Sequence, residues 1–369
     1  MEFRKCITNL DKSSYAQEKS TPLDTRGFMD CSNGINPFGM SQQVHNAFLE
    51  FDIAELNTYP KPAISLKRVI KEYWDDVSEV DERQIILGDG SIELIYKINK
   101  LFIDDSSSVM GYSPQFSDFV DDVKANGGRY ESYILNGSNN FKMNPEVFID
   151  MMSNDHSLFY IDNPNNPTGQ VIHIDDLERI VKHASELGRP IVIDEAYGDF
   201  ISKSNSAITL MNKYENLIVI RSLSKGLGLA GLRAGYMVTS KEVSHQYNKV
   251  SNPYEMNSIA RHIAEAALKD CQFMKDCSKK IIALKKRFTE SLEELVVVQT
   301  DKSVPIMTLM HPDKSVDLEK LLMKHEIISV SCRGFVGLGQ NFVRLMIHAD
   351  VDDLIDRFRR IENEVKYTC

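Results

Sequence analysis

The stretch Leu217-Ile-Val-Ile-Arg-Ser-Leu-Ser-Lys225-Gly-Leu-Gly-Leu-Ala-Gly-Leu-Arg233-Ala-Gly-Tyr236 decides how the rest of the chain is organised. Its first four residues are apolar and mostly β-branched, which predicts a short buried strand. Hydroxyl groups and a single amine follow at the end of that strand. Four glycines in the next ten residues disfavour a regular helix and allow the backbone to approach a ligand closely. We therefore predict a phosphate site beside Lys225.

A lysine in such a turn is suited to Schiff-base chemistry, because a desolvated amine near other cations has a lowered pKa. An exposed turn with solvated charges would be the better interpretation of an isolated Ser-x-Ser-Lys. Here, however, similar polar clusters follow several short apolar runs, at 88–91, 112–116, 162–169, 194–197 and 221–225. Ligands of open α/β sheets bind at the carboxyl ends of the strands, so these clusters predict one common site.

The composition excludes several classes of protein. The chain has 369 residues, of which 42% are hydrophobic and 26% charged, as expected for a globular protein with one large and one smaller domain. A net charge of −10 argues against a general nucleic-acid binder. We expect a cytoplasmic location, because no N-terminal signal and no run of membrane-spanning length is evident. The six cysteines and nine histidines lack metal-ligand spacings, so we expect free thiols and no metal site.

Short apolar runs alternate with helical patterns through most of the chain, which predicts an α/β fold with a mostly parallel mixed sheet covered by helices. We expect its strands near 85–87, 109–111, 130–135, 157–161, 190–193 and 217–220. A smaller α+β domain should follow, with strands near 304–309, 327–330 and 342–347, and with helices at about 272–295 and 352–365. The predicted parts are an N-terminal arm that joins the small domain (1–45), a large ligand-binding domain (46–248) and a small domain (249–369).

Three motifs carry a resemblance to a known family. They are Asn163-Pro-Asn-Asn-Pro-Thr-Gly169, Val192-Ile-Asp-Glu-Ala-Tyr197 and the opening stretch from Arg221 to Tyr236. In their order and spacing the chain resembles pyridoxal-phosphate (PLP) enzymes of the aspartate-aminotransferase fold, known as fold type I, over essentially its whole length. Within that group it is most similar to histidinol-phosphate aminotransferases and threonine-phosphate decarboxylases. The resemblance implies PLP as cofactor and a homodimer with shared active sites.

The resemblance also implies roles for individual residues. Lys225 would form the internal aldimine and then move the Cα proton as a general acid and base. Asp194 would pair with the pyridinium nitrogen, so that the ring can accept electrons. Tyr197 and Asn166 would bind the ring O3′, and Phe116 would stack on the ring.

The cofactor phosphate would be held by several groups together. The backbone at the start of a helix favours an anion, because its amide groups and its dipole point toward the ligand. The residues that the resemblance assigns to this cup are Gly90, Ser91, Ile92, Ser222, Ser224 and Arg233. Tyr59 would reach the phosphate in the neighbouring subunit.

Arg344 stands in an otherwise apolar strand, and a buried arginine needs an anionic partner, which is either a structural carboxylate or a ligand. The resemblance assigns Arg344 to the anionic group of the substrate, together with Arg333 and Asn36. Histidinol-phosphate aminotransferases usually carry an arginine near the position of Val330, and the nearest one in this chain is Arg333.

We therefore predict a PLP-dependent aminotransferase that acts on a small phosphorylated or carboxylated amine and a keto acid. The alternative is a decarboxylase of a phosphorylated amino acid, which needs the same lysine, aspartate, tyrosine and phosphate cup. A non-catalytic effector domain is a further alternative. It would need a fused DNA-binding domain, and only about thirty residues precede the fold, fewer than a domain requires.

Overall fold

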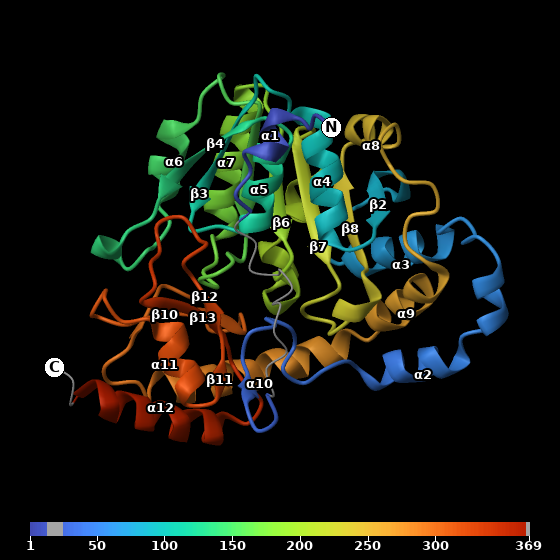
Figure 1. Cartoon of the computed structure of the whole chain (residues 1–369). Helices are drawn as coiled ribbons and strands as arrows, with labels where there is room; N and C mark the ends of the chain where they lie inside the picture. Colours follow the sequence, from blue (N-terminus) through green and yellow to red (C-terminus); the bar gives the residue numbers. More distant parts are fainter. Residues whose placement is uncertain (13–24, 367–369) are drawn as a thin grey trace.

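A seven-stranded sheet forms the centre of the molecule in the computed structural model, which describes residues 1–12 and 25–366 (Figure 1). Its order is β2-β8-β7-β6-β5-β3-β4. Only β8 is antiparallel to its neighbours, so the mostly parallel mixed sheet is confirmed. The strands are β2 (Ile85–Gly88), β3 (Ser108–Ser113), β4 (Arg129–Ile134), β5 (Leu158–Asp162), β6 (Ile191–Glu195), β7 (Leu217–Ser222) and β8 (Gly235–Thr239).

Both faces of this sheet are buried. Alternate residues of a strand point to opposite sides, so each strand contributes side chains to both faces. Ile191 and Ile193 of β6 join one hydrophobic cluster, and Val192 between them joins the other. One face is covered by α4 (Ser91–Phe102), α5 (Ser117–Ala125) and α8 (Lys241–Tyr247). The other face is covered mainly by α3 (Ile64–Trp74), α6 (Pro145–Met151) and α7 (Ile174–Glu186). Burial on both sides explains why the central strands are continuous apolar runs.

The periodicity of α7 shows how such a helix is specified. Its buried residues recur at intervals of three and four and so form one stripe, Leu177, Ile180, Val181 and Ala184. The helix begins at Ile174. The side chain of His173 caps it by accepting a hydrogen bond from the backbone of Asp175.

A second, smaller sheet has the antiparallel order β12-β13-β10-β9 and lies below the large sheet in Figure 1. Its strands are β9 (Val296–Val297), β10 (Ile306–Met310), β12 (Val330–Ser331) and β13 (Phe342–Met346). Helices α9 (Ser258–Lys269) and α10 (Cys271–Thr289) lead from the large sheet to it. It is packed against α11 (Leu318–Lys324) and α12 (Val351–Lys366).

Two expectations for this part were wrong. The strand expected near 327–330 is two strands with different partners, because Ser329 separates β11 (Ile327–Ile328) from β12. β11 pairs in parallel with β1 (Met29–Asp30) near the N-terminus, whereas β12 pairs with β13. The long helix expected to reach about residue 295 ends at Thr289, and the chain then turns into β9.

The N-terminal region adds α1 (Lys5–Thr8) and α2 (Gln42–Glu50), and α2 extends along the lower right edge in Figure 1. Short 3-10 helices are η1 (Ile53–Asn57), η2 (Glu82–Gln84), η3 (Gly137–Asn139), η4 (Gly198–Phe200), η5 (Lys203–Asn205), η6 (Ala207–Leu210) and η7 (Ala230–Leu232). The domain boundaries at 45 and 248 stay a prediction. Residues 13–24 of the predicted arm lie outside the described residues.

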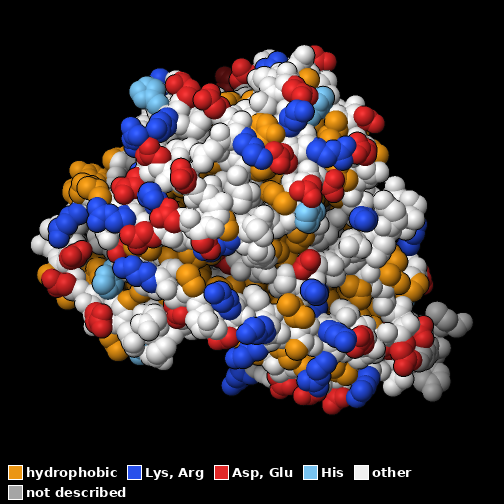
Figure 2. Space-filling view, turned by 180° about the vertical axis from the view of Figure 1, so that it is seen from behind, with side chains coloured by type: hydrophobic (Ala, Val, Ile, Leu, Met, Phe, Trp, Pro, Cys, Tyr) orange, Lys and Arg blue, Asp and Glu red, His pale blue; other side chains and the backbone are white. Residues whose placement is uncertain are grey.

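Charged side chains of both signs are interspersed over the face seen in Figure 2. No helix in the described part of the chain combines the length and apolar character needed to cross a bilayer. Five cysteines are free thiols, namely Cys6, Cys31, Cys271, Cys277 and Cys332. In residues 1–12 and 25–366 no group of three or more metal-ligating side chains could hold a metal ion.

Candidate active site

A cavity of about 260 Å³ lies at the carboxyl edge of the seven-stranded sheet. It receives the ends of β5, β6 and β7 and the start of α4. The structure brings many of the predicted residues together around it, namely Ser91, Ile92, Phe116, Asn166, Asp194, Tyr197, Ser222, Ser224, Lys225 and Arg233. Since these residues are up to 142 positions apart in sequence (91 to 233), the sheet is what makes them neighbours.

Lys225 lies in the turn after β7, where its half-buried side chain faces Tyr197. Its Nζ lies 5.6 Å from the centre of the Tyr197 ring. The backbone of the turn is fixed by Asn36, whose amide nitrogen donates to the Lys225 carbonyl (2.9 Å) and whose Nδ2 donates to the Gly226 carbonyl (2.8 Å). Gly228 completes the turn at φ +71°, where a Cβ atom would lie only 2.4 Å from the Gly39 carbonyl oxygen. The amine is thus held at the cavity by a defined backbone.

Asp194 is the second-last residue of β6 and is almost completely buried. Its Oδ2 accepts a hydrogen bond from the Tyr160 hydroxyl (2.7 Å) and its Oδ1 accepts one from the Ala196 amide (2.9 Å). Burial raises the pKa of Asp194 to about 6, although these two hydrogen bonds act in the opposite direction. A buried carboxylate of this kind is stabilised by a cationic partner, so the site suits a protonated ring nitrogen.

Two further groups at the cavity can bind a phenolic oxygen. The Tyr197 hydroxyl is buried and makes no hydrogen bond with any described residue. A buried hydroxyl without a hydrogen bond lowers the stability of the fold unless a ligand or a water molecule supplies the missing partner. Asn166 presents its side chain to the same cavity, and its Oδ1 accepts a hydrogen bond from Nη1 of Arg344 (2.9 Å).

The start of α4 has the geometry of an anion-binding site. Gly90 precedes the helix at φ +82°, and a Cβ atom there would lie 2.6 Å from Nη2 of Arg233, so glycine lets the guanidinium approach the helix. Gly90 has no side chain that could cap the first turn, so the N-cap position leaves backbone N–H groups available. The hydroxyls of Ser222 and Ser224 line the same cavity. This set of amides, hydroxyls and one guanidinium is suited to a phosphate group.

Taken together, these groups are compatible with PLP. The cavity offers a phosphate cup, a buried carboxylate for the ring nitrogen, two polar groups for the phenolic oxygen and an amine. Phe116, at the start of α5, provides an aromatic ring on the wall. The donor set therefore matches each polar group of the predicted cofactor.

Five predicted residues do not line this cavity. Gly90 lies immediately before Ser91, the first residue of α4, which does line it. Asn36 contacts the backbone of the Lys225 turn through the two hydrogen bonds described above. Arg344 is buried beside it, where Nη1 binds Asn166 and Nη2 donates to the Ser32 carbonyl (2.6 Å). Tyr59 is 74% exposed and stacks on Tyr254 with 4.3 Å between the ring centres.

Arg333 lies apart from the other predicted residues. Its side chain is 51% exposed, and Nη2 lies 2.5 Å from Oδ2 of Asp317 and 3.0 Å from Oε1 of Gln340. The loop that follows β12 turns the guanidinium toward the start of α11 instead of toward the cavity. The structure therefore gives no support to a substrate-binding role for Arg333.

Some residues that line the cavity were not predicted from the sequence, namely Asp118, Asp162, Pro164, Ala196 and Ala230. Asp162 had a usable signal, because it is the first polar residue after the apolar run of β5. Burial raises the pKa of its carboxyl group to about 7, and hydrogen bonds from Asn165 and Asn166 oppose that rise. Asp118 lies in the first turn of α5 and had no comparable signal.

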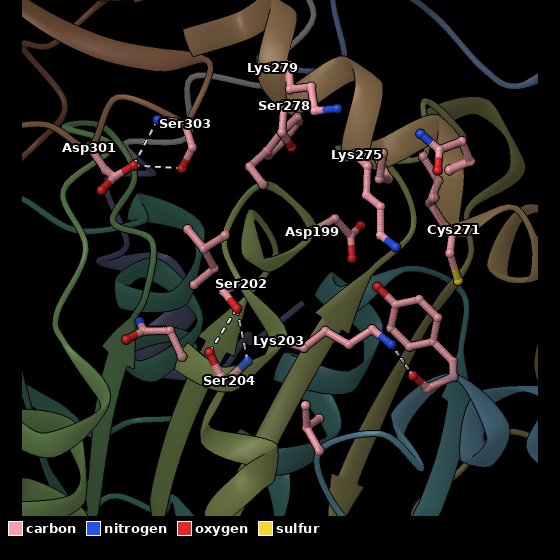
Figure 3. Close-up of a pocket in the computed structure, with 18 of the residues that line it drawn as sticks. Asp199, Ser202, Lys203, Ser204, Cys271, Lys275, Ser278, Lys279, Asp301 and Ser303 are labelled. Carbon is pink, nitrogen blue, oxygen red and sulfur yellow. Dashed lines mark hydrogen bonds between the residues drawn. The ribbon is translucent and has the colours of Figure 1, made fainter.

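A larger cavity, of about 970 Å³, lies between α10 and the 3-10 helices η4 and η5 (Figure 3). It shares no lining residue with the smaller cavity and contains none of the predicted site residues. Its acidic groups are engaged by the protein itself. Asp199 pairs with Arg221, and Asp301 accepts hydrogen bonds from Ser303. Size alone therefore does not identify the site, and the chemical groups point to the smaller cavity.

Comparisons with known proteins identify the family of the chain. The model of the family aminotransferase class I and II matches residues 26–358. A histidinol-phosphate aminotransferase of Clostridium novyi (strain NT) is 28% identical over 312 residues, which cover 84% of each chain. The solved histidinol-phosphate aminotransferase from Clostridium acetobutylicum is 25% identical with a TM-score of 0.82, covering 91% of this chain and 99% of that one.

The solved histidinol-phosphate aminotransferase from Sinorhizobium meliloti, in complex with pyridoxal-5'-phosphate, has a TM-score of 0.81 at 20% identity and covers 98% of each chain. At that identity the likeness concerns the fold. The comparisons confirm the fold class that the sequence predicted.

Proposed function

Since the chain belongs to the class I and II aminotransferase family and is a PLP-dependent aminotransferase, we propose that its amino donor is a small amine that carries a phosphate or a carboxylate. The observation that carries this proposal is the cavity that joins Lys225, Asp194 and the start of α4. A buried arginine, Arg344, lies next to that cavity through Asn166. A guanidinium suits a phosphate or a carboxylate, because its planar N–H groups match either anion in pairs.

The arrangement of the cavity supports a proposed role for each residue. When bound, PLP supplies an electron-accepting ring that stabilises negative charge at the substrate Cα. Asp194 would hold the ring nitrogen, and Tyr197 with Asn166 would hold the phenolic oxygen. The amides of Ser91 and Ile92 would hold the phosphate, together with Ser222, Ser224 and Arg233.

Lys225 is the proposed acid and base. Its amine is held at the cavity wall by the turn described above, so it can take the proton from the substrate Cα and keep it at Nζ until it is returned. Tyr197 faces the amine across the cavity, and its hydroxyl has no partner in the described residues. That hydroxyl would fix the orientation of the ligand beside the lysine.

Incubation of the holoenzyme with amino donors tests the proposed substrate class. Amines with a phosphate or carboxylate group should yield the corresponding keto compound and leave the cofactor in its pyridoxamine form. Neutral amines of the same length should react poorly. Release of CO₂ from a phosphorylated amino acid, without a keto product, would instead show the decarboxylase, which the comparisons do not support better than the aminotransferase.

The Arg344→Lys variant tests the proposed anion clamp. Lysine keeps the charge but lacks the planar fork, so we expect weaker substrate binding with little change in cofactor binding. Loss of a buried charge-assisted pair should reduce kcat/KM by an amount equivalent to roughly 2–5 kcal/mol. Steady-state kinetics beside thermal melts would measure both effects.

Arg333→Ala is the matched control for that variant, because Arg333 is a nearby arginine with an exposed ion pair to Asp317. Exposed pairs contribute little, so its kinetics should stay close to wild type. A large drop in the melting temperature of Arg344→Lys with unchanged KM would assign Arg344 to the core and refute the clamp.

We further propose a cytoplasmic homodimer in which Tyr59 reaches the partner's site. The segment from α2 to Tyr59 exposes several large apolar side chains, which is unusual for a free surface. Tyr59 is exposed and does not line the cavity of its own chain, as expected for a residue that serves a second copy. The exposed residues of this segment are Phe48, Leu49, Ile53, Leu56 and Tyr59.

A mixing experiment tests the shared site. Tyr59→Ala and Lys225→Ala subunits should each be poorly active alone, because one lacks a phosphate contact and the other lacks the amine. In a mixed dimer one site has both residues if Tyr59 acts across the interface. Random mixing should then restore about a quarter of wild-type activity. Light scattering would report the oligomeric state, and a mixture no more active than its parents would exclude the crossed arrangement.

A further inference from the structure

Asp162 sits at the end of β5 and is 3% exposed. Both of its carboxylate oxygens accept hydrogen bonds. Oδ2 accepts from the backbone amides of Asn166 (3.0 Å) and Phe116 (3.3 Å), and Oδ1 accepts from Nδ2 of Asn165 (2.9 Å). One buried side chain thus binds two segments that follow different strands.

Asn165 closes this arrangement into a ring. Its Nδ2 also donates to the carbonyl of Pro114 (3.0 Å), two residues before Phe116. The Tyr112 hydroxyl adds a third link, because it donates to the backbone carbonyl of Asp162 (2.8 Å). The segment after β3 and the segment after β5 are therefore joined by side chains at several points.

These side-chain links replace a sheet ladder that stops early. β3 and β5 pair only at Val109 with Leu158 and at Met110 with Phe159, although both strands continue for three more residues. Beyond those two pairs β3 and β5 form no further ladder pairs with each other. The relative position of their carboxyl ends, and of Phe116 and Asn166, then depends on the ring around Asp162.

A carboxylate is chemically required in this ring. It has only acceptor atoms, and here three N–H groups point at it. An asparagine at the same position would have to direct its NH₂ group at an N–H donor or leave that donor without a partner. Either outcome leaves a buried polar group unsatisfied, which is costly in a low-dielectric interior.

We propose that Asp162 is a positioning residue that fixes Phe116 and Asn166 on the walls of the cofactor cavity, an inference that rests on the proposed function of those two residues. Asp162 acts through them, by setting the distance between the aromatic wall and the amide that faces the phenolic oxygen. Disruption of the ring should therefore change how the cofactor is held before it changes the fold of the large domain.

The test compares Asp162→Asn with Glu362→Gln as a matched control. Glu362 is also buried and accepts hydrogen bonds from backbone amides, those of Glu293, Glu294 and Leu295, but it lies on α12 in the small domain. Both variants lose an acceptor for buried N–H groups, so both should melt at a lower temperature. Only Asp162→Asn should change the cofactor site.

The readouts are the dissociation constant of PLP and the visible circular dichroism of the bound cofactor. For Asp162→Asn we expect a PLP dissociation constant raised roughly tenfold to a hundredfold, as for loss of hydrogen bonds to a charged group, and a changed dichroism band. Glu362→Gln should match wild type in both. Equal PLP affinity and an unchanged band in Asp162→Asn would overturn the proposal.

Two further measurements keep the result unambiguous. If Asp162→Asn does not fold, Asn165→Ala provides the test, because it keeps the Asp162 carboxylate but removes the donor to Oδ1 and the link to Pro114. It also removes the oxygen that accepts hydrogen bonds from the amide and the hydroxyl of Thr168. A raised PLP dissociation constant in Asn165→Ala would support the proposal, and a wild-type value would overturn it. Wild-type protein that fails to bind PLP through Lys225 would instead refute the proposed function itself.

Discussion

Replacement of Lys225 by alanine is expected to give a folded protein without aminotransferase activity. The variant loses the only amine that lines the smaller cavity among the described residues, and with it the proposed acid and base. A positioned proton-transfer group alone contributes typically about 10²–10⁴-fold in rate. Borohydride should fix PLP to the peptide that contains Lys225 in the wild type, and mass spectrometry should find no such adduct in the variant.

Lys203→Ala is the control for this prediction, because Lys203 lines the larger cavity (Figure 3). That lysine pairs with Asp76 and donates to the Tyr73 carbonyl, so its loss should affect stability only. Its borohydride adduct should be the same as in wild type. An adduct that persists in Lys225→Ala but disappears in Lys203→Ala would show that the cofactor binds in the larger cavity.

The strands of the large sheet could be predicted because their signal is local. A strand buried on both faces must be apolar throughout, and the runs at 158–161, 191–193 and 217–220 have no other stable environment. The polar clusters that follow them could be joined into one site by the rule that ligands bind at the carboxyl edge of such a sheet. The apolar runs, the polar clusters that follow them and the carboxyl-edge rule were thus enough to predict which segments form most of the cavity wall.

The small domain was harder to predict, because its pairings are between distant segments. β1 and β11 are two residues each and are separated by about 300 positions in sequence (29 and 327), so no local sequence pattern indicates that they pair. The break at Ser329 follows from that pairing, because β11 turns to β1 and β12 turns to β13. Sequence periodicity carries no information about a partner so far away.

Arg333 and Asp162 show the same limit at the level of single residues. Arg333 is the arginine nearest to the position at Val330 where one was expected, but the loop after β12 directs its guanidinium toward Asp317. The position of Asp162 after the apolar run of β5 marks it as polar at the sheet edge, but its role depends on the backbone amides of Phe116 and Asn166. Backbone groups are the same in every residue, so the sequence gives no sign of which ones need an acceptor.

Replacement of Asp194 by asparagine is expected to keep part of the PLP binding and to lose most of the activity. Without the carboxylate the ring nitrogen has no buried anionic partner, and its protonated form is no longer favoured in the cavity. Removal of one preorganised electrostatic group typically costs on the order of 10²–10³-fold in kcat. Single-turnover kinetics, together with the absorbance of the bound cofactor, would measure this loss.

Glu195→Gln is the matched control, because Glu195 is the next residue of β6 and its side chain points to the opposite face. It binds Arg221, Ser206 and the amide of Ala207, away from the cavity. Its loss should lower the melting temperature without changing the cofactor spectrum. A near wild-type turnover of Asp194→Asn would show that another group faces the ring nitrogen.

The protein without cofactor offers an independent check on Asp194, through the pH dependence of its stability. Burial raises the pKa of Asp194 from 3.8 to about 6, so between these values the folded state binds more protons than the unfolded state. The free energy of unfolding should therefore fall as pH rises from about 4 to about 6, by about 3 kcal/mol for a shift of this size. Asp194→Asn should lack this component, because an amide does not titrate. Parallel pH slopes for the two proteins in urea denaturation would mean that Asp194 is not the buried acid, and the ring nitrogen would then need another partner.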